Sequence, residues 1–411
     1  MIGESGKPAH GLRIVITYPF PLGRANGGAR MTREIARHLG KSGAEVIVLP
    51  VSASPDKRFS RPKVEDRFLG FEFDDDLSRD SVEVVRVPQH ALHWRFDGRE
   101  VRRSLAQIIK QRRVDAVLSY YHEAAFLPPF LHSRNVTFGY IATWQSYAKA
   151  LPAARKNWVR RFVGARLDHE FIIKPHRQAD IVFATSQFTR DELINVLGVD
   201  GKRIVVCHLG VGPGFTELDR PAPEQITRFL FFGRIIKSKG VLDAIQALGR
   251  LARKGIRNWE YRIFGSGEHQ WARNAAREQG IGELVVVSDP VDDSGLRREL
   301  SQAHLAIMPS HFEAFGLSIA EAQAAGIPVV AYNAGSVPEI VENGVTGWLA
   351  PVGDVDALAR SIEQAVQNPA ITHRAGLAGR TRVTAKFAWQ HTAATIIDGL
   401  RGLERRESGN H

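Results

Sequence analysis

The chain has 411 residues, of which 44% are hydrophobic, and a formal net charge of +11. This length favours two domains over one, and the single cysteine, Cys207, excludes an internal disulfide bond. No apolar run approaches the roughly 20 residues that a membrane-spanning helix needs, and the first residues lack the apolar region of a signal peptide, so we expect a cytoplasmic protein. The positive charge favours an anionic partner: a nucleotide sugar, a phospholipid surface or, ranked last because neither zinc-finger spacing nor an RNA-binding signature is present, nucleic acid.

The first half of the chain alternates short apolar runs with helical patterns, which is typical of a parallel α/β sheet. The predicted strands are 12–18, 45–51, 116–119, 139–142, 180–185 and 203–207, and the predicted helices include 101–112 and 190–197. The charged segment 53–100 is predicted as loop with an edge strand. A proline-containing linker over 216–227 then ends the first domain.

A glycine-containing loop follows the first strand and precedes a helix that ends near Gly43. Strand, glycine loop and helix together are a phosphate-binding arrangement, and the pair Gly27-Gly28 would let the backbone approach a ligand closely. The alternative is a flexible turn without a binding role.

Polar side chains follow two later strands. In open α/β sheets ligands bind beyond the carboxyl ends of the strands, where His122 and the run Thr143-Trp144-Gln145 are expected. His122 is therefore a candidate ligand contact, although a loop histidine is more often only solvated. The acidic run 74–76 resembles an Asp-x-Asp metal motif, but it follows no strong strand and is predicted as a solvated turn.

Apolar residues recur at helical spacing over 153–171, and basic residues cover the other side. Such a basic amphipathic helix could lie on an anionic membrane surface. The alternative, which we favour, is a helix that packs its apolar face on the domain core and solvates its arginines.

The second half predicts another parallel sheet, with strands at 229–232, 261–264, 284–288, 305–308, 329–332 and 347–349 and helices at 356–367 and 390–403. The first of these strands leads to Gly233-Arg234, and Lys239 follows shortly after. Two cations between a strand and a helix would neutralise a diphosphate. The run Gly265-Ser266-Gly267 is only a weak match to a dinucleotide-binding fingerprint, because position 270 is not glycine.

The stretch 309–349 contains the strongest candidate site. An alanine-rich helix should begin near Gly316 and stop at Gly326, so that its first amides point at whatever lies ahead of it. A phosphate would suit that place, and Glu313 and Glu321 could hold hydroxyl groups on either side of it. The alternative is a surface helix with two solvated glutamates.

Segment 310–321 places two glutamates eight residues apart around Phe315-Gly316-Leu317, and 338–341 and 343–347 follow it. This pattern resembles the retaining GT-B glycosyltransferases of the glycosyltransferase family 4 (group 1) type. The resemblance implies that Glu313 binds the hydroxyls of the donor sugar, that Glu321 binds the ribose, and that the intervening amides bind the diphosphate.

The resemblance also assigns the remaining site residues. Arg234 and Lys239 would bind the donor phosphates and stabilise the departing nucleoside diphosphate, and His122 would contact the sugar or its phosphate. The implied catalytic residues are Arg234, Lys239, Glu313 and His122. The implied donor-binding residues are Gly27, Gly28, Gly233, Gly265, Phe315, Gly316, Leu317 and Glu321.

The implied fold is GT-B, with two Rossmann-like, doubly wound parallel-sheet domains facing each other across a cleft. Residues 1–216 would bind the acceptor and 217–385 the donor, and 386–411 would form a helix that crosses back to the first domain. The implied reaction moves a hexose from a UDP- or GDP-linked sugar to an acceptor hydroxyl with retention, without metal or cofactor, in cell-surface glycan, glycolipid or glycoside biosynthesis. The alternatives are a sugar-nucleotide-binding protein without transfer, or a sugar-nucleotide epimerase or phosphorylase.

Overall fold

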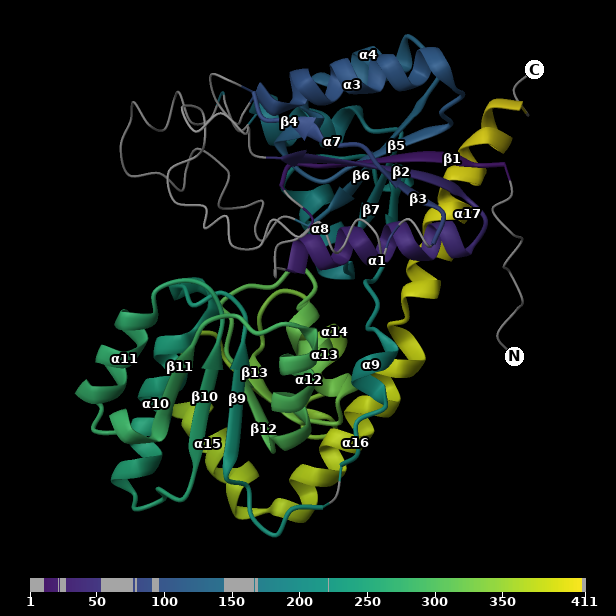
Figure 1. The fold of residues 1–411 in the computed structure, drawn as a ribbon. Coiled ribbons are helices and arrows are strands. Elements are labelled where there is room, and N and C mark those ends of the chain that lie inside the picture. The colour runs from purple at the N-terminus through teal and green to yellow at the C-terminus, as the bar shows by residue number, and fades with distance from the viewer. Residues whose placement is uncertain are drawn as a thin grey trace. The chain divides into compact units, whose positions relative to one another are not determined.

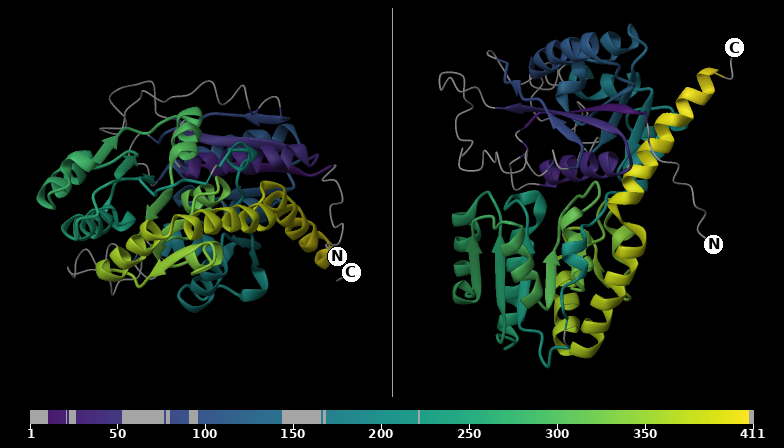
Figure 2. Two further views of the ribbon diagram at one scale, coloured as in Figure 1. Left: turned by 90° about the horizontal axis from the view of Figure 1, so that it is seen from below. Right: turned by 45° about the vertical axis from the view of Figure 1, so that its right-hand side comes forward.

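The chain divides into two compact units, and each is built on one parallel sheet with helices on both faces (Figure 1, Figure 2). The computed structural model describes residues 11–20, 22, 27–52, 77, 80–90, 96–143, 166, 169–220 and 222–408. The first unit comprises Met1–His208 and Trp389–His411, and the second comprises Leu209–Ala388. The predicted class of two parallel-sheet α/β domains is confirmed.

The sheet of the first unit has the described order β3-β2-β1-β5-β6-β7-β8, and β4 pairs with β2. The strands are β1 (Arg13–Tyr18), β2 (Glu45–Ser52), β3 (Val82–Val84), β4 (Val87–Pro88), β5 (Ala116–Ser119), β6 (Thr137–Ala142), β7 (Ile181–Ala184) and β8 (Ile204–Val206). Within the described residues, the strand pairings of this sheet are parallel; Ile14, for example, pairs with Val46 and Ala116. Helices cover both faces of a parallel sheet, which explains why these strands are almost entirely apolar.

The helices of the first unit follow the strands along the chain. They are α1 (Gly27–Lys41), α3 (Asp97–Gln111), α4 (Pro128–His132), α7 (Lys174–Gln178), α8 (Gln187–Asn195) and α17 (Trp389–Ser408), with the shorter turns η4 (His122–Phe126), η6 (His169–Ile173) and η7 (Gly201–Arg203). Helix α8 begins earlier than predicted because Ser186 Oγ caps it, accepting from the amide of Thr189 at 3.0 Å. Helix α17 packs against α1 and β7, so the C-terminal helix belongs to the first unit.

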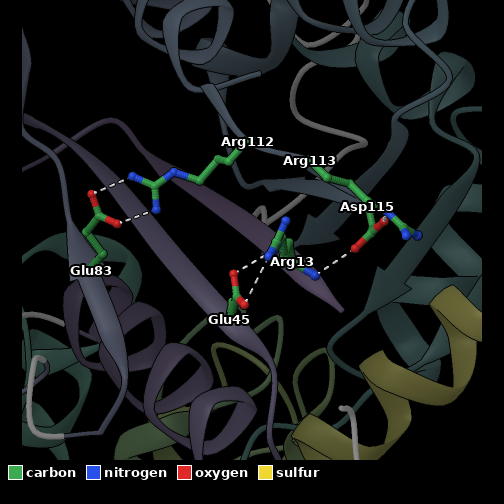
Figure 3. Close-up of polar contacts among 6 residues, drawn as sticks. All are labelled: Arg13, Glu45, Glu83, Arg112, Arg113 and Asp115. Carbon is green, nitrogen blue, oxygen red and sulfur yellow. Dashed lines mark hydrogen bonds and ion pairs between the residues drawn. The ribbon is translucent and has the colours of Figure 1, made fainter. Parts of the chain in front are cut away.

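Charged side chains pair at the amino ends of the strands of the first sheet, opposite the edge at which ligands bind in this kind of fold (Figure 3). The six residues drawn are Arg13, Glu45, Glu83, Arg112, Arg113 and Asp115. The backbone amide of Arg13 donates to Oδ2 of Asp115 at 2.8 Å. The Nη1 and Nη2 atoms of Arg112 donate to the carboxylate of Glu83 at 2.7 and 3.1 Å. A pocket of about 140 Å³ opens here. Each of its arginines already has a carboxylate partner, so the cluster stabilises the sheet edge rather than attracting an anion.

The sheet of the second unit has the order β11-β10-β9-β12-β13-β14, which is the strand order of a doubly wound dinucleotide-binding fold. The strands are β9 (Arg228–Phe232), β10 (Glu260–Phe264), β11 (Val285–Ser288), β12 (Leu305–Met308), β13 (Val329–Tyr332) and β14 (Gly347–Ala350). Each lies within one or two residues of its predicted position. The two strands that lie next to each other where the order reverses are β9 and β12.

The helices of the second unit cover both faces of this sheet. They are α9 (Pro213–Thr216), α10 (Val241–Arg253), α11 (His269–Glu278), α12 (Asp293–Gln302), α13 (Leu317–Ala324), α14 (Val337–Ile340), α15 (Val355–Gln367) and α16 (Pro369–Lys386), with the turns η8 (Lys237–Lys239) and η9 (Gly282–Leu284). Helix α16 is missing from the sequence prediction. It packs against α13, and a Cβ at Gly376 would lie 2.2 Å from the carbonyl oxygen of Gly326, so glycine serves close packing there.

Three predicted features lie outside the described residues: the acidic run 74–76, the pair Trp144 and Gln145, and most of the basic segment 153–171. At the end of that segment, the Phe171 ring lies 6.5 Å from Phe96 and 6.0 Å from Phe126. These contacts favour core packing for Phe171. No helix within the described ranges combines the length and the apolar character that crossing a membrane requires.

Candidate active site

The candidate donor site lies where β9 and β12 end side by side in the second unit. The chain leaves β9 through Gly233 and Arg234, and it leaves β12 through a loop that leads to Glu313. Ligands of doubly wound sheets bind beyond the carboxyl ends of the strands at this reversal of strand order. The topology therefore places the predicted donor-binding segments of the second unit at one edge of its sheet.

Two of the predicted glycines allow the loops after β9 and β10 to touch. Gly233 has φ +146° and Gly265 has φ +158°, and a Cβ at Gly265 would lie only 1.6 Å from the carbonyl oxygen of Gly233. The amide of Gly233 donates to Phe264 at 2.9 Å, and the amide of Ile235 donates to Ser266 at 2.8 Å. Arg234 follows Gly233 in the first of these loops, and it is exposed.

Lys239 ends the turn η8, and Gly240 follows it in a left-handed conformation with φ +68°. A Cβ at Gly240 would lie 1.9 Å from the carbonyl oxygen of Pro309, a distance that no side chain could accommodate. Glycine at position 240 therefore allows the start of α10 to lie directly against the loop after β12. This contact brings Lys239 to Glu313.

Lys239 and Glu313 form a buried ion pair. The Nζ of Lys239 donates to Oε1 of Glu313 at 2.6 Å, and the two side chains are 14% and 8% exposed. The carbonyl of Glu313 also accepts the amide and the hydroxyl of Ser336, both at 3.1 Å. Because a buried charge is costly unless it is paired, each group compensates the other here. A phosphate could replace Glu313 as the partner of Lys239, and sugar hydroxyls could replace Lys239 as donors to Glu313.

Helix α13 begins as predicted. Gly316, with φ +91°, precedes Leu317, and the first helical hydrogen bond joins the amide of Ala320 to Gly316 at 3.0 Å. The amides of the residues between them precede that bond and lack an intrahelical acceptor. Gly326, with φ +74°, follows the end of the helix in the predicted left-handed conformation.

Both glutamates of the motif are buried, with exposures of 6% for Glu313 and 4% for Glu321. The alternative of a surface helix with two solvated glutamates is therefore wrong. The ring of Phe315, between them, packs edge-to-face on Phe387 at 5.5 Å. The motif is thus part of the packed interior at the edge of the second sheet.

In the first unit, His122 follows β5 after two tyrosines and begins the turn η4. It is 8% exposed, so the alternative of a merely solvated histidine is wrong. Its Nε2 lies 3.7 Å from Oδ2 of Asp97, which is fully buried. A Cβ at Gly98 would lie 2.5 Å from the carbonyl oxygen of Glu123, so glycine lets α3 approach this turn closely.

Glu123 is not among the site residues predicted from the sequence. Its side chain is fully buried, and its Oε1 accepts the amides of Tyr120 and Tyr121 at 3.0 and 3.2 Å and the hydroxyl of Thr17 at 3.3 Å. Burial raises the pKa of this carboxyl, an effect that His122 and the backbone amides oppose. Its position in the loop beyond the carboxyl end of β5 is a signal that the sequence carries, whereas its burial is not.

The pair Gly27 and Gly28 lies in the first turn of α1 rather than in the loop before it. Its carbonyl at Gly28 accepts the hydroxyl of Thr32 at 2.9 Å. The prediction of a loop position is corrected accordingly, since the helix begins at Gly27. Within the described part of the chain, no group of three or more histidine, cysteine, aspartate or glutamate side chains could hold a metal ion.

Two family models match the chain, one in each half. Residues 25–214 match the model for Glycosyltransferase Family 4, and residues 219–382 match the model for Glycosyl transferases group 1. The second match contains every predicted site residue of the second unit.

Curated relatives are similar over part of their length. Glycogen synthase of Mycobacterium tuberculosis is 34% identical over 236 residues, which cover 56% of this chain and 56% of that protein. The amylovoran biosynthesis glycosyltransferase AmsK of Erwinia amylovora is 29% identical over 285 residues, which cover 64% of this chain and 69% of that protein. The chain spans little more than half the length of most of the curated relatives that it matches.

Solved structures share the fold. Sucrose-phosphate synthase from Thermosynechococcus elongatus has a TM-score of 0.75 at 19% identity and covers 97% of this chain and 100% of its own. HepE of Anabaena, solved in complex with UDP-glucose, has a TM-score of 0.68 at 18% identity and covers 95% of this chain and 100% of its own. At such identities the likeness establishes the fold alone. With a family model matched in each half and the fold shared with these structures, the chain belongs to the GT-B glycosyltransferases of the family 4 (group 1) type.

Proposed function

We propose that this chain is a retaining, metal-independent glycosyltransferase that moves a hexose from a UDP- or GDP-linked sugar to an acceptor hydroxyl. The observation that carries the proposal is the buried Lys239–Glu313 pair at the reversal point of the second sheet, 2.6 Å between Nζ and Oε1. A cation and a carboxylate held together there match the two halves of a nucleoside diphosphate sugar, which are a diphosphate and a polyhydroxylated ring.

In the proposed donor complex, Lys239 and Arg234 bind the diphosphate, and the first amides of α13 add neutral donors. Negative charge grows on the diphosphate as the glycosidic bond breaks, so preorganised cations stabilise the transition state more than the ground state. Glu313 then accepts from the sugar hydroxyls, and Glu321 accepts from the ribose.

Retention follows from a front-side displacement in this proposal. The bond between the anomeric carbon and the diphosphate oxygen breaks while the acceptor oxygen attacks from the same face. The leaving phosphate takes the proton of the acceptor hydroxyl, so no protein nucleophile and no cofactor are required. His122 of the first unit contacts the sugar or its phosphate in this proposal.

The acceptor is a glycan, a lipid-linked sugar or a small glycoside, in cell-surface or glycoside biosynthesis at a cytoplasmic location. A relative named for amylovoran biosynthesis and a fold neighbour solved with UDP-glucose support this class of donor and acceptor. Peripheral contact of 153–171 with an anionic membrane is a separate alternative and not part of this proposal, because the contacts of Phe171 with Phe96 and Phe126 favour packing on the core.

The test is product analysis with a panel of UDP- and GDP-linked hexoses, in the presence of EDTA. The expected result is a new glycoside whose anomeric proton has the configuration of the donor, together with release of the nucleoside diphosphate. Inversion would refute retention, and dependence on added metal would refute metal independence. Sugar isomerisation without acceptor would indicate an epimerase, and consumption of inorganic phosphate would indicate a phosphorylase.

A further inference from the structure

A hydrogen-bonded network lies beside the Lys239–Glu313 pair, and its centre is Asp243 in the first turn of α10. The Oδ2 of Asp243 contacts Nε2 of His311 at 2.9 Å and accepts the hydroxyl of Tyr332 at 2.8 Å. The rings of His311 and Tyr332 also meet edge-to-face, with centroids 5.6 Å apart. Because a carboxylate only accepts hydrogen bonds, Nε2 of His311 carries a proton in this arrangement.

This network joins the two segments that carry the ion pair. His311 lies two residues before Glu313, and its amide donates to the carbonyl of Ser238, next to Lys239, at 2.9 Å. Asp243 stands one helical turn after Lys239. The backbone bond of His311 to η8 and its side-chain bond to the start of α10 therefore tie both elements to the loop after β12.

The burial of Tyr332 and the position of Asp243 in α10 both favour the hydrogen bonds of this network. Tyr332 is fully buried, so its hydroxyl needs the partner that Asp243 provides. The carboxylate of Asp243 lies in the first turn of a helix, where the helix dipole favours a negative charge. The side chains of Asp243 and His311 are 18% and 37% exposed, which makes His311 the accessible end of the network.

We propose that Asp243 and His311 are positioning residues that hold the Lys239 turn in register with the Glu313 loop. The proposal rests on the proposed function for its consequence, which is preorganisation of the site for a nucleoside diphosphate. Neither side chain is assigned contact with the donor. They act through the backbone segments on which Lys239 and Glu313 stand.

The variants His311→Ala and His311→Gln separate this role from general stabilisation. Alanine removes the bond to Asp243, whereas a glutamine amide offers an N–H close to the position of Nε2. His391→Ala, at an exposed histidine of α17, is the control. Two quantities are measured on the full chain without metal: hydrogen exchange of the amides of Lys239 and Gly240, and the Kd for UDP and for GDP.

We expect His311→Ala to accelerate exchange at Lys239 and Gly240 about fivefold or more, because these amides bond only within their short turn. The Kd for the nucleotide that the wild type binds should rise about tenfold, as it does when a supporting hydrogen bond is lost. His311→Gln and His391→Ala should stay within about twofold of the wild type in both measurements.

Unchanged exchange at Lys239 and Gly240 in His311→Ala would overturn the positioning role, whatever the nucleotide affinities are. Equal effects of alanine and glutamine would also overturn it, because the Nε2 bond would then not be the cause. Accelerated exchange in a protein whose wild type binds neither UDP nor GDP would support the positioning role and refute the donor assignment. The two proposals therefore fail separately.

Discussion

Replacement of Lys239 by methionine perturbs the proposed donor site at the ion pair between Lys239 and Glu313. Methionine keeps an unbranched apolar side chain and removes the ammonium group that donates to Glu313 at 2.6 Å. In the donor complex the lost group is one charge-assisted bond to phosphate, worth about 1.5–3 kcal/mol, so Kd for the nucleoside diphosphate should rise roughly 10- to 150-fold. Turnover should fall further, because charge on the diphosphate grows in the transition state.

Stability must be separated from binding in this experiment. Removing one partner of a fully buried pair costs about 3–5 kcal/mol, and the residual exposures of 14% and 8% place this pair near or below the lower limit. The double variant Lys239→Met/Glu313→Gln removes both charges and should recover most of the free energy of unfolding while binding remains weak. Lys237→Met, at an exposed lysine of the same turn, is the matched control.

Isothermal titration calorimetry with UDP and GDP measures the affinity, and urea denaturation measures the stability of each variant. The expected order of affinity is wild type equal to Lys237→Met, with both Lys239 variants much weaker. If Lys239→Met binds the nucleotide as tightly as the wild type, the role of Lys239 as a phosphate ligand is refuted.

Three further predictions concern stability. Gly240→Ala should lower the free energy of unfolding by about 2–4 kcal/mol in urea denaturation, because its Cβ would lie 1.9 Å from the carbonyl oxygen of Pro309. Gly255 also has a positive φ but nothing within 4 Å of the position that a Cβ would take, so Gly255→Ala should lower it by only about 1 kcal/mol. Equal costs of the two substitutions would refute the close approach of Gly240 to Pro309 as the cause. Asp115→Ala should lower the free energy of unfolding by about 1–3 kcal/mol, because the amide of Arg13 then lacks its acceptor. Glu83→Ala removes one partner of an exposed ion pair and should lower it by less than about 1 kcal/mol. A larger loss in Glu83→Ala than in Asp115→Ala would contradict this reasoning. Burial and the charges of Arg220 and Arg228 lower the pKa of His304, whose Nδ1 accepts the amide of Thr227, so the folded state binds its proton less tightly than the unfolded state. The stability that neutral His304 contributes is therefore complete above the unfolded pKa of 6.5 and is lost as the pH falls from there through the folded pKa. His304→Asn keeps an acceptor for Thr227 and should remove this part of the pH dependence of the free energy of unfolding. An unchanged pH profile in that variant would refute the role of His304.

The strands were predictable because a parallel sheet buried on both faces leaves continuous apolar runs, and 229–232 is the plainest of them. The start of α13 at Gly316 was predictable for a different reason, since an alanine-rich run between two glycines specifies both helix ends. Helix α16 was not predictable in this way. Its glycines interrupt the apolar period, and their role becomes visible only from the approach of Gly376 to Gly326.

The candidate site likewise has a part that the sequence predicts and a part that it does not. The motif around Glu313 and Glu321 was predictable from the sequence, because two carboxylates flank a predicted helix start. The bond from His311 to Asp243 joins residues 68 positions apart, and nothing local in the sequence specifies it. The burial of Glu123 and Asp97 likewise follows from the packing of α3 on the turn η4, which the spacing of residues along the chain does not encode.

We expect a nucleoside diphosphate to bind at the carboxyl edge of the second sheet. Hydrogen exchange of the whole chain, measured in EDTA with and without saturating UDP or GDP, checks this expectation. Exchange should slow in two segments, 233–240 and 311–319, and should change little at the amino edge of the first sheet around Arg13 and Arg112. Unchanged exchange in both segments, with protection elsewhere or none at all, would contradict it.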